Sequence, residues 1–197
     1  GGAGGGIHLD VGSLSGAGRV ESIGASYIYG GNYHTGGGGR ISVYVDDRSG
    51  FSGNFLAKSD VTGKVAGAGT VYIKESGQTY GHLLVDNGGR TAQANSTPLR
   101  SVGRRVITDV YEATPGVWKV EVAGSPWKAS DSSLQWGLAG IDVDLDASET
   151  ASTHYPIVSN TTNVLTLHTT DDLSAVVGNE LVGVHTFQTL NVKGNAA

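Results

Sequence analysis

The sequence predicts an all-β protein: a right-handed parallel β-helix, or solenoid, with an antiparallel β subdomain inserted into it. Two observations predict this fold. A glycine-punctuated phrase recurs along the first part of the chain, beginning at Gly4, Gly38 and Gly67. Its copies are roughly 30 to 35 residues apart, a spacing typical of stacked repeats. A segment of different texture follows, with less glycine and all three tryptophans, and it favours an antiparallel insertion.

Each copy of the phrase predicts one strand of the solenoid. Small residues form a turn, and a short run of alternating apolar and polar residues follows, which is the period-two pattern of a half-buried strand. The runs cover residues 7–11, 41–45 and 70–73. A second phrase at residues 14–23 resembles residues 51–58, and we expect it to supply a second strand for each coil. Glycines would occupy the corners, where only glycine adopts positive φ freely.

The remaining segments of the solenoid are predicted from glycine content and from one further repeat. The tract 27–37 is too rich in glycine for a strand, and we expect it to be a loop protruding from one corner. Residues 189–195 repeat the Leu-x-Val pattern of residues 82–89. The chain would therefore leave the solenoid near residue 90 and return to it near residue 188. The predicted parts are solenoid rungs over 1–90, an inserted antiparallel sandwich or barrel-like subdomain over 91–188, and a return strand over 189–197.

The inserted segment is predicted to be a series of short strands. Runs of strand-forming residues recur about every ten residues between turn signals, which is typical of an antiparallel sandwich or barrel. These runs cover residues 105–111, 117–122, 140–145, 155–159, 164–167 and 182–187. The only predicted helix is short, over residues 170–178, where a capping-type start precedes a glycine stop.

Composition excludes several classes of function. The net charge is −5, and thirteen Lys and Arg spread over the chain provide no basic face for nucleic acid. No apolar stretch approaches the length of a membrane span. Cysteine is absent, which excludes disulfides, thiolate metal sites and cysteine nucleophiles. Since the chain has no initiator methionine, we expect it to be one piece of a longer secreted protein, located outside the cell.

Several phrases resemble modules of one class of protein. They are Gly-Gly-Gly-Arg-Ile at 37–41, Gly-Ala-Gly-Thr-Val-Tyr at 67–72, Leu-Val-Asp-Asn-Gly-Gly at 84–89, Ile-Val-Ser-Asn-Thr-Thr at 157–162 and Leu-Val-Gly-Val-His-Thr-Phe at 181–187. These phrases resemble very large secreted bacterial surface proteins of the adhesin type. The resemblance implies a glycine-rich parallel β-helix, shaped like a pectate lyase or an autotransporter passenger, with β-rich inserts. It implies no catalytic residue, because this shape carries adhesins, fibres and polysaccharide enzymes alike.

A calcium site is one hypothesis for an alternating acidic run. Asp142, Asp144 and Asp146 alternate with apolar residues, and calcium prefers several carboxylate oxygens. Ala147 stands at the sixth position, where a loop of the EF-hand type needs glycine. The alternative is a strand that turns its apolar residues inward and its aspartates to water. No other cofactor is predicted.

Aromatic residues provide a candidate glycan contact. Tyr27, Tyr29 and Tyr33 lie in the glycine-rich tract, and an aromatic face with a polar tip suits stacking on sugars. The alternative for these tyrosines is packing within the loop. The three tryptophans of the inserted segment favour core filling instead.

No enzymatic site is predicted. Asp46 and Asp47 could supply paired carboxylates for glycoside cleavage, but adjacent strand residues point to opposite faces, and the sequence after them is typical of a turn. The six histidines show no metal-ligand spacing, and no nucleophile is placed beside a base. A polysaccharide lyase or hydrolase is the alternative.

The functional prediction is a structural or adhesive module of an extracellular bacterial surface polymer or filament. A β-helix has two open ends whose edge strands can pair with another chain, and we expect like modules to join end to end as a homopolymer or tandem repeat. Head-to-tail contacts of this kind form open filaments. The alternative is a carbohydrate-binding module whose partner is a surface polysaccharide, with the three tyrosines as its contact.

Overall fold

The computed structural model describes residues 2–60, 65–92, 96–131, 137–149 and 153–196, and the account below concerns these residues. The prediction of an all-β protein is confirmed, because fifteen strands and no α-helix occur among them. In place of the helix expected over residues 170–178, only a single 3₁₀ turn forms, at Ser174–Val176. A segment this short cannot offset the cost of nucleating a helix.

The chain divides into two compact units. Unit 1 comprises Gly1–Pro98 and Thr186–Ala197, and unit 2 comprises Leu99–His185. The division of the chain into separate folding domains over 1–90, 91–188 and 189–197 stays a prediction.

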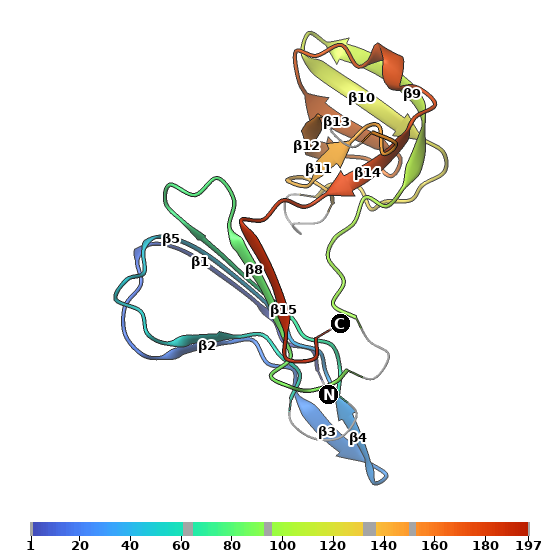
Figure 1. Ribbon diagram of the computed structural model, residues 1–197. Helices are drawn as coiled ribbons and strands as arrows, with labels where there is room; N and C mark the ends of the chain where they lie inside the picture. The colour runs from blue at the N-terminus through green and yellow to red at the C-terminus, as the bar shows by residue number, and fades with distance from the viewer. Residues whose placement is uncertain (1, 61–64, 93–95, 132–136, 150–152, 197) are drawn as a thin grey trace. The chain divides into compact units, whose positions relative to one another are not determined.

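Unit 1 is built on a mixed five-stranded sheet in the order β1-β5-β7-β8-β15 (Figure 1). The strands are β1 (Gly6–Ser13), β5 (Arg40–Asp47), β7 (Thr70–Glu75), β8 (His82–Asp86) and β15 (Thr189–Lys193). β1, β5 and β7 run parallel, β8 runs antiparallel to β7, and β15 is parallel to β8. The strands at the two edges of the sheet are therefore β1 and β15.

Two pairs of shorter strands complete unit 1. β2 (Arg19–Glu21) pairs in parallel with β6 (Asn54–Leu56). β3 (Ser26–Tyr29) and β4 (Asn32–Thr35) form an antiparallel hairpin where the sequence predicted a loop (Figure 1). Gly30 and Gly31 connect these two strands with φ values of 57° and 77°. Positive φ at both central residues is the requirement of a type I′ turn, so the glycines form a hairpin here.

The prediction of a right-handed parallel β-helix, or solenoid, is wrong. The strands of unit 1 are divided among separate sheets, and β8 runs antiparallel to β7. Only residues 76–81 lie between these two strands. A parallel neighbour requires a crossover of about a dozen residues or more, so a connection this short makes a hairpin. Gly77, with φ 82°, and the bond from the Gln78 N–H to the Glu75 carbonyl form its turn.

The core of unit 1 lies between the large sheet and the β2–β6 pair. Ile41, Val43 and Val45 of β5 are at most 4% exposed. The partly buried apolar residues that pack against this cluster are Ile7, Leu9, Val11, Leu14, Val20, Phe55, Ile73 and Leu84. We call the sheet surface that these side chains cover the inner face, and the opposite surface the outer face.

Glycines allow the chain to stack closely at the start of three parallel strands. Gly5, Gly39 and Gly69 each precede a strand by one residue, and the register pairs the residues that follow them. A Cβ on Gly69 would overlap the carbonyl oxygen of Gly39, and a Cβ on Gly39 would overlap that of Gly5. The recurring glycines of the sequence are therefore required by backbone packing.

Unit 2 is a closed antiparallel barrel in the order β10-β13-β12-β11-β14-β9, closed by pairing of β9 with β10 (Figure 1). Its strands are β9 (Arg105–Thr114), β10 (Val117–Val122), β11 (Asp142–Asp144), β12 (His154–Asn160), β13 (Val164–His168) and β14 (Glu180–Val184). A closed barrel has no free sheet edges.

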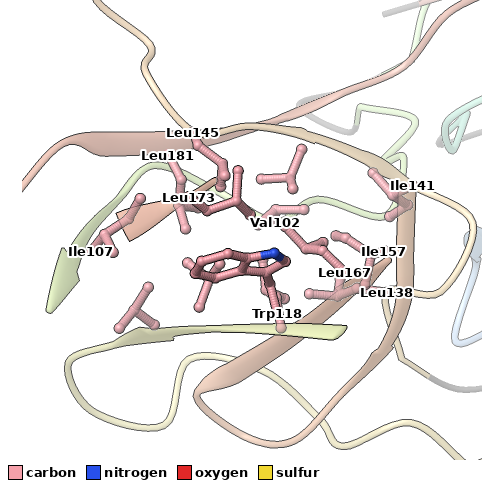
Figure 2. Close-up of a cluster of buried hydrophobic side chains, with 14 of the residues drawn as sticks. Val102, Ile107, Trp118, Leu138, Ile141, Leu145, Ile157, Leu167, Leu173 and Leu181 are labelled. Atoms are coloured by element: carbon pink, nitrogen blue, oxygen red, sulfur yellow. The ribbon is translucent and has the colours of Figure 1, made fainter. Parts of the chain in front are cut away.

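Apolar side chains fill the barrel interior. Figure 2 shows the Trp118 ring among aliphatic side chains that come from several strands. Val120, Leu165 and Leu167 are 0% exposed. Trp127 is also buried, and its indole N–H donates to the Val102 carbonyl at 2.9 Å. Two tryptophans therefore serve the core, as the sequence favoured, while Trp136 lies outside the described residues.

Candidate functional site

On β1, β5 and β7, the outer face of the large sheet carries polar and aromatic side chains in register, while on β8 it carries the buried Leu83 and Val85. Side chains alternate along a strand, so the residues between the buried valines and isoleucines of β5 point to this face. Parallel pairing aligns them with their neighbours on β1 and β7. One row consists of His8, Ser42 and Tyr72, and the next of Asp10, Tyr44 and Lys74.

Aromatic rings form a continuous series across this face. The ring centroids of His8 and Tyr44 are 5.5 Å apart, and those of Tyr44 and Tyr72 are 5.8 Å apart. Phe187 continues the series, 6.4 Å from Tyr72. The planes are tilted by 55° to 60°, an arrangement that aromatic pairs prefer over a face-to-face sandwich. A hydrogen bond of 2.7 Å between His8 Nδ1 and Ser42 Oγ orients the first ring.

A shallow pocket of about 360 Å³ adjoins Tyr44. Its polar lining residues include Asp10, Asp46, Lys74 and Gln78. Among the residues that the structure describes, no hydrogen bond or ion pair engages the side chains of Asp10, Asp46 or Lys74. Two carboxylates and one ammonium group are therefore available to a ligand beside an exposed aromatic ring. We call Tyr44 and these four residues the Tyr44 platform.

Burial raises the pKa of the Tyr44 hydroxyl, and the neighbouring Tyr72 and Asp10 raise it further. A tyrosine hydroxyl is protonated at neutral pH, and a raised pKa leaves this unchanged. The Tyr44 side chain can then both donate and accept a hydrogen bond at the edge of the pocket.

The hairpin β3–β4 presents two of the three tyrosines that the sequence predicted as a glycan contact. Tyr27 and Tyr29 are 54% and 70% exposed, and their rings lie nearly parallel, with centroids 6.3 Å apart and planes 17° apart. Tyr33 is opposite Ile28 in the register, and its side chain lies outside the described residues. The prediction that Tyr27, Tyr29 and Tyr33 bind a glycan stays a prediction.

The aspartates predicted as a calcium site take part in a turn after β11. Asp144 is 6% exposed, and its Oδ1 accepts the Asp146 N–H at 2.8 Å. Asp146 in turn accepts hydrogen bonds from Ser148 and from the Asn179 side chain. No cluster of three or more metal-ligand side chains occurs within the described ranges. Calcium binding by Asp142, Asp144 and Asp146 stays a prediction.

The neighbouring carboxylates Asp46 and Asp47 have different environments. Asp46 belongs to the Tyr44 platform and lines the pocket there. Asp47 accepts the Ser49 N–H at 2.8 Å, and this backbone hydrogen bond lowers the pKa of the Asp47 carboxyl. Asp47 therefore stabilises the turn after β5, which is the role that the sequence favoured for it.

Another hollow of unit 1, about 610 Å³, is floored by glycine backbone at the start of β1, β5 and β7. Among the described residues that line it, only Arg40 is charged. Because the glycines are explained by close stacking of strands, their presence gives no indication of a ligand.

β15 is an exposed strand edge. All five of its residues are exposed, including Leu190 at 57% and Val192 at 54%. It contains no proline, and its only charged residue, Lys193, lies 3.6 Å from the Asp86 carboxylate. An edge with apolar side chains and little charge is a site for strand pairing, because natural edges that resist pairing carry proline or charge.

No protein family, curated protein or solved structure matches the chain. The resemblance to secreted bacterial surface proteins therefore stays a prediction. Within the part of the chain that the structure describes, there is no helix of the length and apolarity needed to cross a membrane.

The sequence reasoning missed the Tyr44 platform, although a signal for it was present. The recurring phrases align His8, Ser42 and Tyr72 at the same position of three strands, and they align Asp10, Tyr44 and Lys74 two residues later. Comparing these outward positions across the copies would have placed the polar groups around Tyr44.

Proposed function

We propose that this protein is a structural or adhesive module of an extracellular bacterial surface polymer, in which like modules associate end to end. The observation that carries the proposal is the β15 edge, where Leu190 and Val192 are more than half exposed and no described strand pairs with the outer side of β15. Pairing with a second chain would supply hydrogen-bond partners for the β15 backbone and would cover both side chains. The proposal contains no catalytic step, and polysaccharide lyase or hydrolase activity is its alternative.

The topology of the sheet supports an open assembly. β1 forms the opposite edge and runs antiparallel to β15, so β15 of one copy can pair with β1 of the next in antiparallel fashion. The contact then joins two different edges of the sheet. Such a contact can repeat from copy to copy and form an open filament instead of a closed ring. Pairing of β15 with β15 of a second copy would instead give a closed dimer.

A second candidate function is a carbohydrate-binding module. The observation that favours it is the pair Tyr27 and Tyr29, exposed with nearly parallel rings on a hairpin. Side chains of this type stack on sugars. A surface polymer that binds a glycan would be adhesive, so the two candidates are compatible.

Charge placed on the β15 edge is expected to prevent assembly. In the double variant Leu190→Lys, Val192→Glu, the edge would carry two charged side chains. Pairing with a second strand would remove these charges from water, which is unfavourable. We expect sedimentation velocity to show wild-type oligomers that grow with concentration. The variant should require at least a roughly tenfold higher concentration to assemble, equivalent to about 1.4 kcal/mol per contact.

Val106→Lys is the matched control, because Val106 is also 57% exposed but lies on β9 of the closed barrel. This variant should assemble as the wild type does. The proposal would be abandoned if the wild-type chain stays monomeric at all concentrations, or if the control variant loses assembly to the same extent.

A further inference from the structure

We propose that the Tyr44 platform binds a neutral polysaccharide, with one hexopyranose ring stacked on Tyr44. The site lies on the outer face of the large sheet, at a pocket of about 360 Å³. This volume is near the lower end of the range for small-molecule sites, roughly 300 Å³ upward, and is therefore suited to one or two sugar units. The site is centred on β5, an interior strand of the sheet, and glycan binding there does not depend on assembly through β15.

The Tyr44 ring is held in place before any ligand binds. Its side chain is 40% exposed, so part of the ring is open to solvent. His8 and Tyr72 contact it from the two neighbouring strands with tilted planes, and Ser42 fixes His8. A ring fixed by its neighbours loses little side-chain entropy on binding, which favours affinity. The apolar C–H groups on one side of a pyranose can then pack against it.

Polar groups surround the ring at distances that a sugar ring can span. Asp10 and Lys74 are the direct cross-strand neighbours of Tyr44, about 5 Å away on either side along the row. Asp46 lies two residues further along β5, about 7 Å away on the same face. The carboxylates can accept hydrogen bonds from sugar hydroxyls, and the Lys74 ammonium can donate to sugar oxygens.

The charge of the platform selects against acidic glycans. The pocket is lined by the carboxylates of Asp10, Asp46 and Glu75 and by one ammonium group, that of Lys74. Arg48 forms an ion pair with Glu75, so two carboxylates and one ammonium group remain to face a ligand. A uronate or sulfate group placed there would meet a net negative charge. Neutral hydroxyls meet no such repulsion. The platform is thus matched to a neutral polysaccharide rather than to a polyuronate.

The platform does not have the character of a protein-binding surface. Stable protein interfaces have an apolar core depleted of charged residues, and they bury about 800 Å² on each partner. Here the Tyr44 ring lies between His8 and Tyr72 and is flanked by three charged residues, Asp10, Asp46 and Lys74. Charged and hydroxyl-binding groups around one aromatic ring favour a hydroxylated ligand.

Affinity electrophoresis of the full chain tests the proposal. The protein is run in native gels containing a neutral polysaccharide (β-glucan, xylan or galactomannan) or polygalacturonate, and oligosaccharides of a retarding polymer are then titrated by calorimetry. We expect retardation by at least one neutral polymer and none by polygalacturonate. Tyr44→Ala should weaken binding about tenfold or more, because the stacking surface is lost. Tyr44→Phe should retain most of the affinity, and Asp10→Asn should weaken it severalfold.

Two control variants separate this site from other exposed tyrosines. Tyr111 is 45% exposed on β9 of the barrel, and Tyr111→Ala should bind as the wild type does. Tyr27→Ala tests the hairpin as a separate contact, and Tyr44→Ala should weaken binding by the same factor with or without this second substitution. Near-ultraviolet circular dichroism checks that each variant is folded. The proposal is overturned if no neutral polymer retards the wild type, if Tyr44→Ala binds normally while folded, or if Tyr111→Ala or Tyr27→Ala causes the loss instead.

Discussion

Replacing Leu165 with alanine is expected to lower the free energy of unfolding of the barrel by about 3 kcal/mol. Leu165 is 0% exposed, and its cross-strand partner Val120 is also fully buried. The substitution removes three buried carbon atoms and leaves a cavity, a change that costs roughly 2 to 5 kcal/mol in well-packed cores. Because all three tryptophans lie within unit 2, chemical denaturation followed by tryptophan fluorescence reports this loss.

The control for this prediction is Val106→Ala, since Val106 is 57% exposed on the same barrel. Its effect should stay within about 0.5 kcal/mol, as is usual for surface substitutions. Equal effects of the two variants would contradict a packed barrel interior centred on Leu165 and its neighbours.

Replacing Gly69 with alanine should destabilise unit 1 by about 3 kcal/mol or more. The added Cβ would overlap the Gly39 carbonyl oxygen and the Gly38 backbone. The Thr70 N–H donates to that same Gly39 carbonyl at 3.0 Å, so the chains cannot separate without losing a hydrogen bond. Overpacking against side chains costs about 1 to 3 kcal/mol, and backbone atoms can adjust less than side chains. Hydrogen-exchange mass spectrometry should show faster exchange in β5 and β7.

Gly5→Ala is the matched control, because Gly5 stands at the equivalent position before β1 and a Cβ there has no neighbour within 4 Å. Exchange in β5 and β7 should be unchanged in this variant. If Gly69→Ala exchanges as slowly as the wild type, the close stacking of strand starts is wrong.

Local patterns in the sequence were sufficient to predict strands but not their connections. Alternation over residues 41–45 and 70–73 correctly indicated strands, and in residues 41–45 every second residue is buried. The solenoid prediction was wrong because it rested on the spacing of the repeats. That spacing does not take into account the short connection between β7 and β8, residues 76–81. A connection of this length is compatible with a hairpin only. The glycine content of residues 27–37 likewise predicts a loop, but Gly30 and Gly31 both have positive φ, which is what a tight hairpin requires.

The sites illustrate the same limit. Tyr27 and Tyr29 were predicted from composition, and their exposure follows from a hairpin that the sequence reasoning did not include. Tyr44 was overlooked because it lies within a strand whose other side forms the core. Its neighbours Asp10 and Lys74 are 34 and 30 residues away from Tyr44 in the chain, and strand register brings them together.

The most direct test of end-to-end association is electron microscopy of the purified chain at increasing concentration. Assembly through β15 and β1 predicts unbranched filaments in which one chain is the repeating unit, joined by a continuous sheet. The Leu190→Lys, Val192→Glu variant should show no filaments under the same conditions. Single particles of one chain, or closed dimers that do not extend, would contradict the account.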